Sequence, residues 1–155
     1  MLNNPVYYWY KPLRDVLKCP FTVETGEDRK SVTVRMADFV PKEQIKLPNE
    51  ATHFRFCLSV GVVWDRVYDK DEERFIEPYG NEFFFGCCPE FKSEWIPKDA
   101  HPMGDLTFSI SLDDTYQLKD DMTVLRCFGI VFGKMLSEVE PLKKDRGSIE
   151  FLGAI

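Results

Sequence analysis

Residues 53–65 have the sequence HFRFCLSVGVVWD, and this stretch decides the fold class. Its apolar side chains occupy every second position, namely Phe54, Phe56, Leu58, Val60, Val62 and Trp64. The positions between them are mostly polar or small. Side chains of a β-strand alternate between its two faces, so the pattern predicts one long strand with one buried face.

Three more segments predict long strands. Residues 106–112 alternate in the same way and are flanked by the turn-forming pairs Gly104-Asp105 and Asp113-Asp114. Residues 122–135 are apolar at both parities, which is typical of a central strand covered on both sides. Within that segment Gly129 and Gly133 indicate a bulge or a close crossing. Residues 149–155 predict a terminal strand that is tied into the sheet.

Shorter strands are predicted between these, at residues 6–10, 21–25, 31–36, 74–76 and 82–86. Ten prolines and nine glycines divide the chain, and no window keeps a helical period for three turns. We therefore expect at most one short helix, within residues 37–45. Seven to nine strands predict an all-β fold, an antiparallel two-sheet sandwich of immunoglobulin-like or related Greek-key type, with a small barrel as the alternative.

The length of 155 residues fits one compact domain. Within it, residues 40–50 are rich in proline and charged residues, and we expect them to form the junction between an N-terminal part and the core. Residues 1–50 would then be an N-terminal arm or strands that pack on the core, and residues 51–155 the sandwich core.

The net negative charge argues against two classes of binding partner. With 20 Lys and Arg against 26 Asp and Glu the formal charge is -6, so we expect no nucleic-acid partner and no anionic membrane surface. The apolar run 124–133 is too short to cross a bilayer. The N-terminus carries no secretory signal pattern, which predicts a cytoplasmic protein, and an odd number of five cysteines favours reduced thiols.

The residues that could support metal or acid–base chemistry are few. Only His53 and His101 titrate near neutral pH, and neither has a partner nearby in sequence. Cys87 and Cys88 are adjacent, without the spaced ligand pairs that zinc requires. We therefore predict no catalytic residue, no metal ion and no cofactor. A metal-dependent enzyme built on the histidines and cysteines is the weakest of the alternatives.

Two further patterns have ordinary structural interpretations. Cys57 and Cys127 lie on two predicted strands, but Trp64 shares the strand of Cys57, so the immunoglobulin disulfide pattern fails. The acidic residues of the first cluster lack the glycine of a calcium loop and predict a solvated hairpin tip. That cluster comprises Asp65, Asp69, Asp71, Glu72 and Glu73. The pairs Asp113-Asp114 and Asp120-Asp121 receive the same interpretation.

Aromatic residues are the remaining candidates for function. Residues 7–10 are Tyr-Tyr-Trp-Tyr, and aromatic side chains on a sheet anchor protein partners or stack on sugars. We predict a non-enzymatic module that associates with another protein or with itself through Tyr8, Trp9, Tyr10 and Trp95.

The alternative is a carbohydrate-binding or glycoside-processing sandwich, whose two carboxylates would be paired in space. Its candidate platforms are Trp9, Trp64 and Trp95, and its candidate acids are Asp113, Asp114, Glu90 and Glu94.

Four segments also occur in a characteristic order: Ala51 to Phe56, Leu106 to Ile110, Val124 to Phe132 and Pro141 to Lys143. Over residues 51–155 the chain resembles the C-terminal part of a Bacteroidota family of uncharacterised proteins. Members of that family have an Ala-Thr-His-Phe-Arg segment at the start of a strand, a Val-x-Gly-Ile-x-Phe strand and a Pro-Leu-Lys segment near the end. The resemblance implies a β-sandwich with no assigned activity, and it supplies no catalytic residues.

Overall fold

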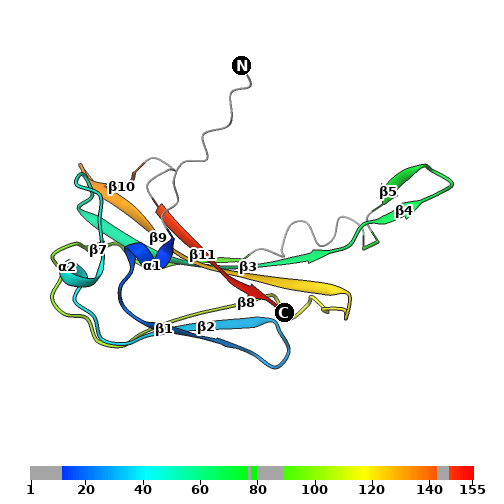
Figure 1. The fold of residues 1–155 in the computed structure, drawn as a ribbon, viewed down its shortest axis with the longest axis horizontal. Coiled ribbons are helices and arrows are strands. Elements are labelled where there is room, and N and C mark those ends of the chain that lie inside the picture. The colour runs from blue at the N-terminus through cyan, green and yellow to red at the C-terminus, as the bar shows by residue number, and fades with distance from the viewer. Residues whose placement is uncertain (1–11, 77, 80–88, 143–146) are drawn as a thin grey trace, which may run out of the picture.

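The structure is a computed structural model, which describes residues 12–76, 78–79, 89–142 and 147–155. Antiparallel strands dominate it (Figure 1). The helices are α1 (Leu13–Val16) and α2 (Pro41–Gln44). The strands are β1 (Phe21–Thr25), β2 (Ser31–Met36), β3 (His53–Trp64), β4 (Val67–Asp69), β5 (Arg74–Ile76), β6 (Glu90–Lys92), β7 (Ile96–Pro97), β8 (Leu106–Ser111), β9 (Met122–Met135), β10 (Val139–Pro141) and β11 (Gly147–Ala154).

The large sheet is built on β3 and β9, which pair along the whole of β3 from His53 opposite Gly133 to Trp64 opposite Met122. On the far side of β9 lie β10 and β11, and on the far side of β3 lie β6 and β7. The even-numbered side chains from Phe54 to Val62 are buried and the odd-numbered ones are more exposed. The predicted long strand with one buried face is therefore confirmed, as are the central strand over 122–135 and the terminal strand.

The small sheet has the order β1-β2-β8. Its strands coincide with the predicted segments 21–25 and 31–36 and with most of 106–112. Val32 and Val34 are fully buried, whereas the opposite face carries hydroxyl groups such as those of Thr33 and Ser109, which lie 2.8 Å apart. This sheet thus has one apolar face toward the core and one polar face toward water.

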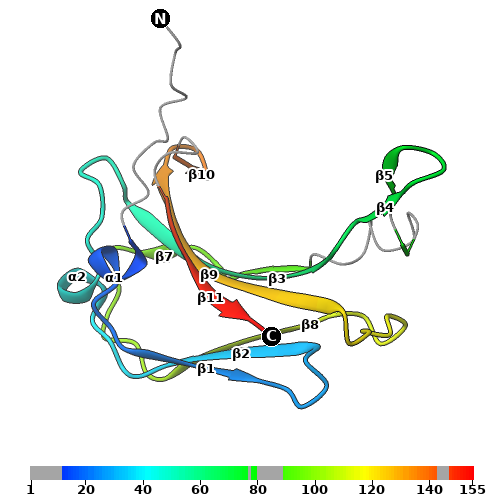
Figure 2. The same cartoon turned by 45° about the vertical axis from the view of Figure 1, so that its right-hand side comes forward.

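The two sheets pack face to face around aromatic rings, and the large sheet curls over the small one (Figure 2). Phe56 of β3 stacks on Phe128 of β9 with ring centroids 5.7 Å apart, and it also contacts Phe108 of β8 at 5.3 Å. Buried residues of the N-terminal segment, among them Leu13 and Phe39, belong to the same cluster. The fold is an all-β sandwich of antiparallel sheets, as predicted.

Two expectations need correction. The described residues contain two short helices, since a second one, α1, forms next to β11, while α2 lies within the predicted 37–45. They also contain eleven strands, more than the seven to nine expected, because pieces of two or three residues such as β7 carry no period of their own. The predicted strands at 6–10 and 82–86 lie outside the described residues.

The glycines of β9 mark close contacts. A Cβ on Gly129 would lie 2.6 Å from the carbonyl oxygen of Ser148, and one on Gly133 would lie 2.8 Å from the ring of Trp95. The close crossing is thereby confirmed. The register shift of this sheet lies on β11, between Phe151 and Gly153, so a bulge at the two β9 glycines was the wrong alternative.

Beyond Trp64 the chain leaves the sandwich as the hairpin β4–β5, which projects from one end of the large sheet (Figures 1 and 2). We call this hairpin, residues 67–76, the arm. It forms a two-stranded sheet of its own. Among the described residues, no helix is long and apolar enough to span a membrane.

Candidate interaction surface

The arm exposes apolar side chains on both of its faces. Tyr68 and Phe75 are a cross-strand pair whose rings meet edge to face at 5.2 Å, and they are 49% and 64% exposed. On the other face Val67, which is 52% exposed, is paired with Ile76. A hairpin in which each face carries an apolar pair presents a contact surface in two directions.

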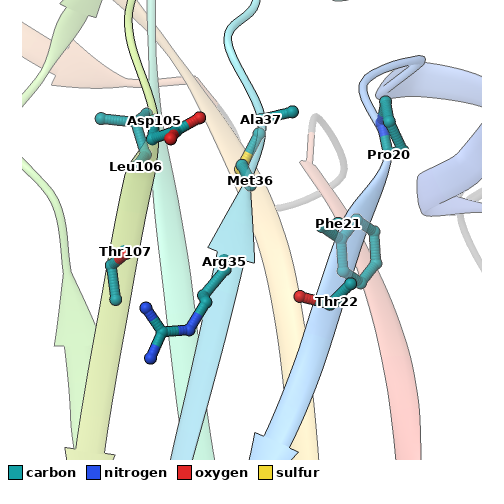
Figure 3. A pocket seen from close by; sticks show the side chains of 9 residues that line it. All are labelled: Pro20, Phe21, Thr22, Arg35, Met36, Ala37, Asp105, Leu106 and Thr107. Carbon is teal, nitrogen blue, oxygen red and sulfur yellow. The ribbon is translucent and has the colours of Figure 1, made fainter.

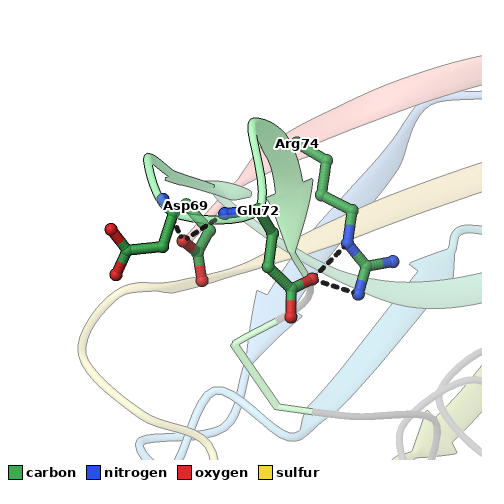
Figure 4. A network of polar contacts seen from close by, with 4 residues as sticks. Asp69, Glu72 and Arg74 are labelled. Atoms are coloured by element: carbon green, nitrogen blue, oxygen red, sulfur yellow. Dashed lines mark hydrogen bonds and ion pairs between the residues drawn. The ribbon is translucent and has the colours of Figure 1, made fainter.

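Polar contacts order the tip of the arm (Figure 4). The carboxylate of Asp69 accepts hydrogen bonds from the backbone N–H groups of Asp71 and Glu72, at 2.8 and 3.1 Å. Arg74 donates to the carboxylate of Glu72. The acidic cluster is therefore a solvated hairpin tip, as predicted. Within the described ranges, no group of three or more His, Cys, Asp or Glu side chains could hold a metal ion.

The base of the arm is fixed by an aromatic cluster that the sequence did not indicate. Trp64, the last residue of β3, meets the ring of Tyr79 edge to face at 5.8 Å. Lys119 places its ammonium group 4.1 Å from the centre of that ring, and the hydroxyl of Tyr79 donates a hydrogen bond to Asp121. This bond raises the pKa of Tyr79, with smaller contributions from burial and from the charge of Asp121. The cluster joins the two ends of the arm to the loop before β9.

A second apolar surface lies on the outer face of the large sheet. Ile149 and Phe151 of β11 are 51% and 57% exposed, and they lie opposite Gly129 and Cys127 of β9. At the end of β9 the exposed large apolar side chains are those of Met135 and Leu136. We call the pair Ile149 and Phe151 the outer patch.

Trp95 is the predicted partner-binding residue that the structure describes. It is half-buried, its ring lies against Gly133, and the guanidinium of Arg55 stacks on it 4.4 Å from the ring centre. It is therefore part of the outer face of the large sheet. The other predicted residues, Tyr8, Trp9 and Tyr10, lie outside the described residues, as do Cys87 and Cys88.

Two shallow pockets lie on the surface formed by the described residues. The first, of about 370 Å³, lies at the end of the small sheet and has Arg35 and Asp105 as its charged lining residues (Figure 3). The second, of about 680 Å³, has Lys42, Lys98 and Asp99. Neither pocket is lined by a histidine, cysteine or tryptophan, and each holds one carboxylate. A paired-carboxylate site beside a tryptophan is therefore absent from both.

Two of the four predicted acids of the carbohydrate alternative, Glu90 and Asp113, have local partners. Glu90 forms an exposed ion pair with Lys92 at 2.9 Å. Asp113 accepts hydrogen bonds from the side chain and backbone of Thr115, and these bonds lower its pKa. Both carboxylates therefore act within their own strand or turn.

The histidines lie in different surroundings. His53 opens β3, where its Nδ1 lies 2.9 Å from the hydroxyl oxygen of Thr52. His101 is an exposed loop residue.

Cys57 and Cys127 lie on adjacent strands of one sheet, so they cannot form an inter-sheet bridge. Cys57 is opposite Gly129 and Cys127 is opposite Ser59, which makes the two cysteines diagonal neighbours. Both thiols are free. Burial raises the pKa of Cys57, with a further increase from the charge of Glu90. Burial also raises the pKa of Cys127, against a smaller opposing effect of its hydrogen bond with Ser59.

Comparison of the chain with protein-family models, with curated proteins and with solved structures finds no match in any of the three. The resemblance to the uncharacterised Bacteroidota family and the immunoglobulin-like arrangement of the strands therefore stay predictions.

Proposed function

We propose that this protein is a non-enzymatic module that acts by protein–protein association, with the arm as its docking element. The observation that carries the proposal is the exposure of Val67, Tyr68 and Phe75 on an arm that projects from the sandwich. Aromatic side chains that leave water on binding are the usual energetic centres of protein interfaces.

The physical argument concerns the stability of the arm. A two-stranded hairpin is marginal in water when no third strand or core covers it. Tyr68 and Phe75 meet edge to face at 5.2 Å, and they stay 49% and 64% exposed. A partner that covered either face would bury them, and burial stabilises by roughly 25 cal/mol per Å² of apolar surface. The arm therefore gains its largest stabilisation in a complex.

Site-specific photo-crosslinking tests the proposal, because a photoreactive side chain forms a covalent bond with a protein that lies against it. Phe75 is replaced by p-benzoylphenylalanine, which keeps an aromatic side chain there, and the protein is irradiated in its native host. Thr107, an exposed residue on the polar face of the small sheet, receives the same group as the matched control. We expect a discrete protein adduct from position 75 and none from position 107. Equal yields of adduct at the two positions, or no adduct at all, would contradict the proposal.

A further inference from the structure

We infer that an extended, acidic segment of another protein adds to β1 as a further strand of the small sheet. It would bind at the open side of the sandwich, where β1 and β11 are the edge strands of the described residues. This surface is separate from the arm. Three features of the open side carry the inference: the unpaired main chain of β1, the half-buried apolar side chains beside it, and a guanidinium group without a carboxylate partner.

The main chain of β1 has free hydrogen-bonding groups. Its residues bond to β2 at every second position, in phase with the N–H of Gly26, which donates to the carbonyl of Ser31. The N–H and C=O groups of Phe21, Val23 and Thr25 therefore point away from β2. Among the described residues these main-chain groups have no hydrogen-bond partner. An edge of this kind is a template for the main chain of another strand.

The other strand edges are short, interrupted or covered. The strands β4, β5, β6, β7 and β10 have only two or three residues each. β11 has a register shift between Phe151 and Gly153, and α1 lies next to it. β8, at the other edge of the small sheet, lies close to β3 and β6. In contrast, β1 has five residues and contains neither a proline nor a bulge. Since short length, proline, bulges and covering elements are what protects an edge, β1 is the edge that stays available to a partner.

Apolar side chains at the open side are only partly covered. Phe21 and Val23 of β1 and Leu152 of β11 are half-buried and pack against the core. The ring of Phe21 faces inward, where it meets Phe128 edge to face at 5.1 Å. A strand beside β1 would direct every second side chain toward the same face. It would therefore add the burial of apolar surface to the main-chain hydrogen bonds.

Arg126 supplies the charge that selects the partner. Its guanidinium donates to the hydroxyl of Thr25 and to the carbonyl of Leu152, which are both neutral groups, and its buried Nε has no hydrogen-bond partner. Within the described part of the chain no carboxylate forms an ion pair with Arg126, and Glu150 of β11 pairs with Arg14 instead. A half-buried charge without a counter-ion is costly, so a carboxylate on the added strand would stabilise it.

A second copy of β1 does not supply that carboxylate. The inward side chains of β1 are those of Phe21, Val23 and Thr25, and none of them is acidic. If two β1 strands paired antiparallel about Val23, Phe21 of one copy would lie opposite Thr25 of the other. Arg14, whose guanidinium stacks on Phe21 at 4.4 Å, would then approach Arg126 of the second copy. Because these like charges repel each other, the arrangement favours a segment of another protein over self-pairing.

Selection from a phage-displayed library of random linear peptides tests the inference, with the full chain as the target. Val23→Pro removes the outward N–H at the centre of β1, and the ladder to β2 does not use that N–H, so the variant should fold. Val23→Thr keeps the N–H and is the matched control. Circular dichroism and urea unfolding check both variants. N-methylation of alternate amides in an enriched peptide blocks the same hydrogen bonds without any change to the protein.

We expect the enriched peptides to combine alternating apolar residues with acidic ones. In titration calorimetry their affinity should decrease about tenfold for Val23→Pro and stay unchanged for Val23→Thr. N-methylation should abolish binding in one of the two alternate sets of amides only. Replacing the acidic residues of a peptide by their amides should weaken its binding to the wild type roughly tenfold, the effect of a hydrogen bond between charged groups. The same replacement should not change its binding to Arg126→Met, which a double-mutant cycle measures.

Strand addition at β1 is excluded if no peptide is enriched, or if the enriched peptides bind Val23→Pro as tightly as Val23→Thr and tolerate N-methylation in both sets. Equal losses on amide replacement in the wild type and in Arg126→Met would mean that the carboxylate does not meet Arg126. A wild-type dimer that Val23→Pro abolishes in sedimentation velocity would assign the edge to a second copy instead. All these variants leave the arm unchanged, so the crosslinks from position 75 decide separately whether the arm is a docking element.

Discussion

Gly129 faces the backbone of β11 at a distance that leaves no room for a side chain. A Cβ at this position would lie 2.6 Å from the carbonyl oxygen of Ser148 and 3.2 Å from the Cα of Ile149. Since these are backbone atoms of a paired strand, they cannot move aside independently. We predict that Gly129→Ala lowers the free energy of unfolding by about 1–3 kcal/mol, the usual cost of overpacking.

Urea unfolding measures this effect, with Gly104→Ala as the matched control. At Gly104 the nearest atom to an added Cβ is 3.8 Å away. The control should therefore change stability by less than about 0.5 kcal/mol. Equal effects of the two substitutions would mean that the close approach of β11 to β9 does not restrict the residue at position 129.

The raised pKa values of the cysteines predict how fast their thiols are alkylated at a given pH. Burial raises the pKa of Cys19, Cys57 and Cys127, and the thiolate is the nucleophile in alkylation. In the native protein all three should react with iodoacetamide more slowly at neutral pH than an unstructured cysteine, with rates that increase only above the ordinary thiol pKa. Mass mapping of the labelled peptides measures this, with urea-unfolded protein as the reference. Equal rates in the native and unfolded protein would contradict it.

At the scale of the element, the order of the arm depends on the aromatic cluster at its base. We predict that Tyr79→Phe leaves the sandwich intact but loosens the arm, because the hydrogen bond to Asp121 is lost while the ring contact with Trp64 remains possible. Trypsin cleavage after Lys70 and Arg74 should become several-fold faster. Cleavage after Arg35, in the small sheet, is the internal control and should not change.

The same bond predicts a pH dependence. Because the pKa of Tyr79 is raised in the folded protein, the stability that it contributes is complete below the ordinary tyrosine pKa. That contribution is lost as the pH increases through the raised value. Protection of the arm in the wild type should therefore decrease in that alkaline range, and the Tyr79→Phe variant should lack this step.

Elements differ in how far the sequence predicts them. The strands β3 and β8 repeat the two-residue period often enough to be recognised, β9 is recognised as a long segment that is apolar at both parities, and β1, β2 and β5 are bounded by proline, glycine or charge. The strands β4, β6, β7 and β10 were missed because two or three residues contain no period. The pairing of β6 and β7 is decided by β3, which is distant in sequence, whereas β4 and β10 pair with strands next to them in the chain.

The candidate surface was less predictable than the fold. Val67 and Tyr68 are adjacent apolar residues in a charged segment, which is the one signal that both faces of a hairpin are apolar. Whether Ile149 and Phe151 are exposed depends on which face of β11 the core covers. The alternation of side chains assigns the residues of β11 to two faces, but only the packing of the sheets decides which face is exposed to water.

At the scale of the whole molecule, the sandwich is open along one side. In the described residues β1 and β11 are edge strands, each paired on one side only. Arg126 of β9 spans the gap between them, since its guanidinium donates to the hydroxyl of Thr25 on β1 and to the carbonyl of Leu152 on β11. Arg14 adds a contact across the same gap, because it stacks on Phe21 and pairs with Glu150.

We predict that Arg126→Met, which keeps the aliphatic stem, destabilises the protein by about 1–3 kcal/mol, because hydrogen bonds to charged groups are among the stronger ones. Since one side chain joins both edges, amide exchange should increase in β1 and β11 together, while the β3–β9 ladder stays protected. The matched control is Arg35→Met, which removes an exposed ion pair with Glu24 and should cost less than about 1 kcal/mol. Faster exchange in only one of the two edge strands would mean that Arg126 serves a single sheet rather than joining the two.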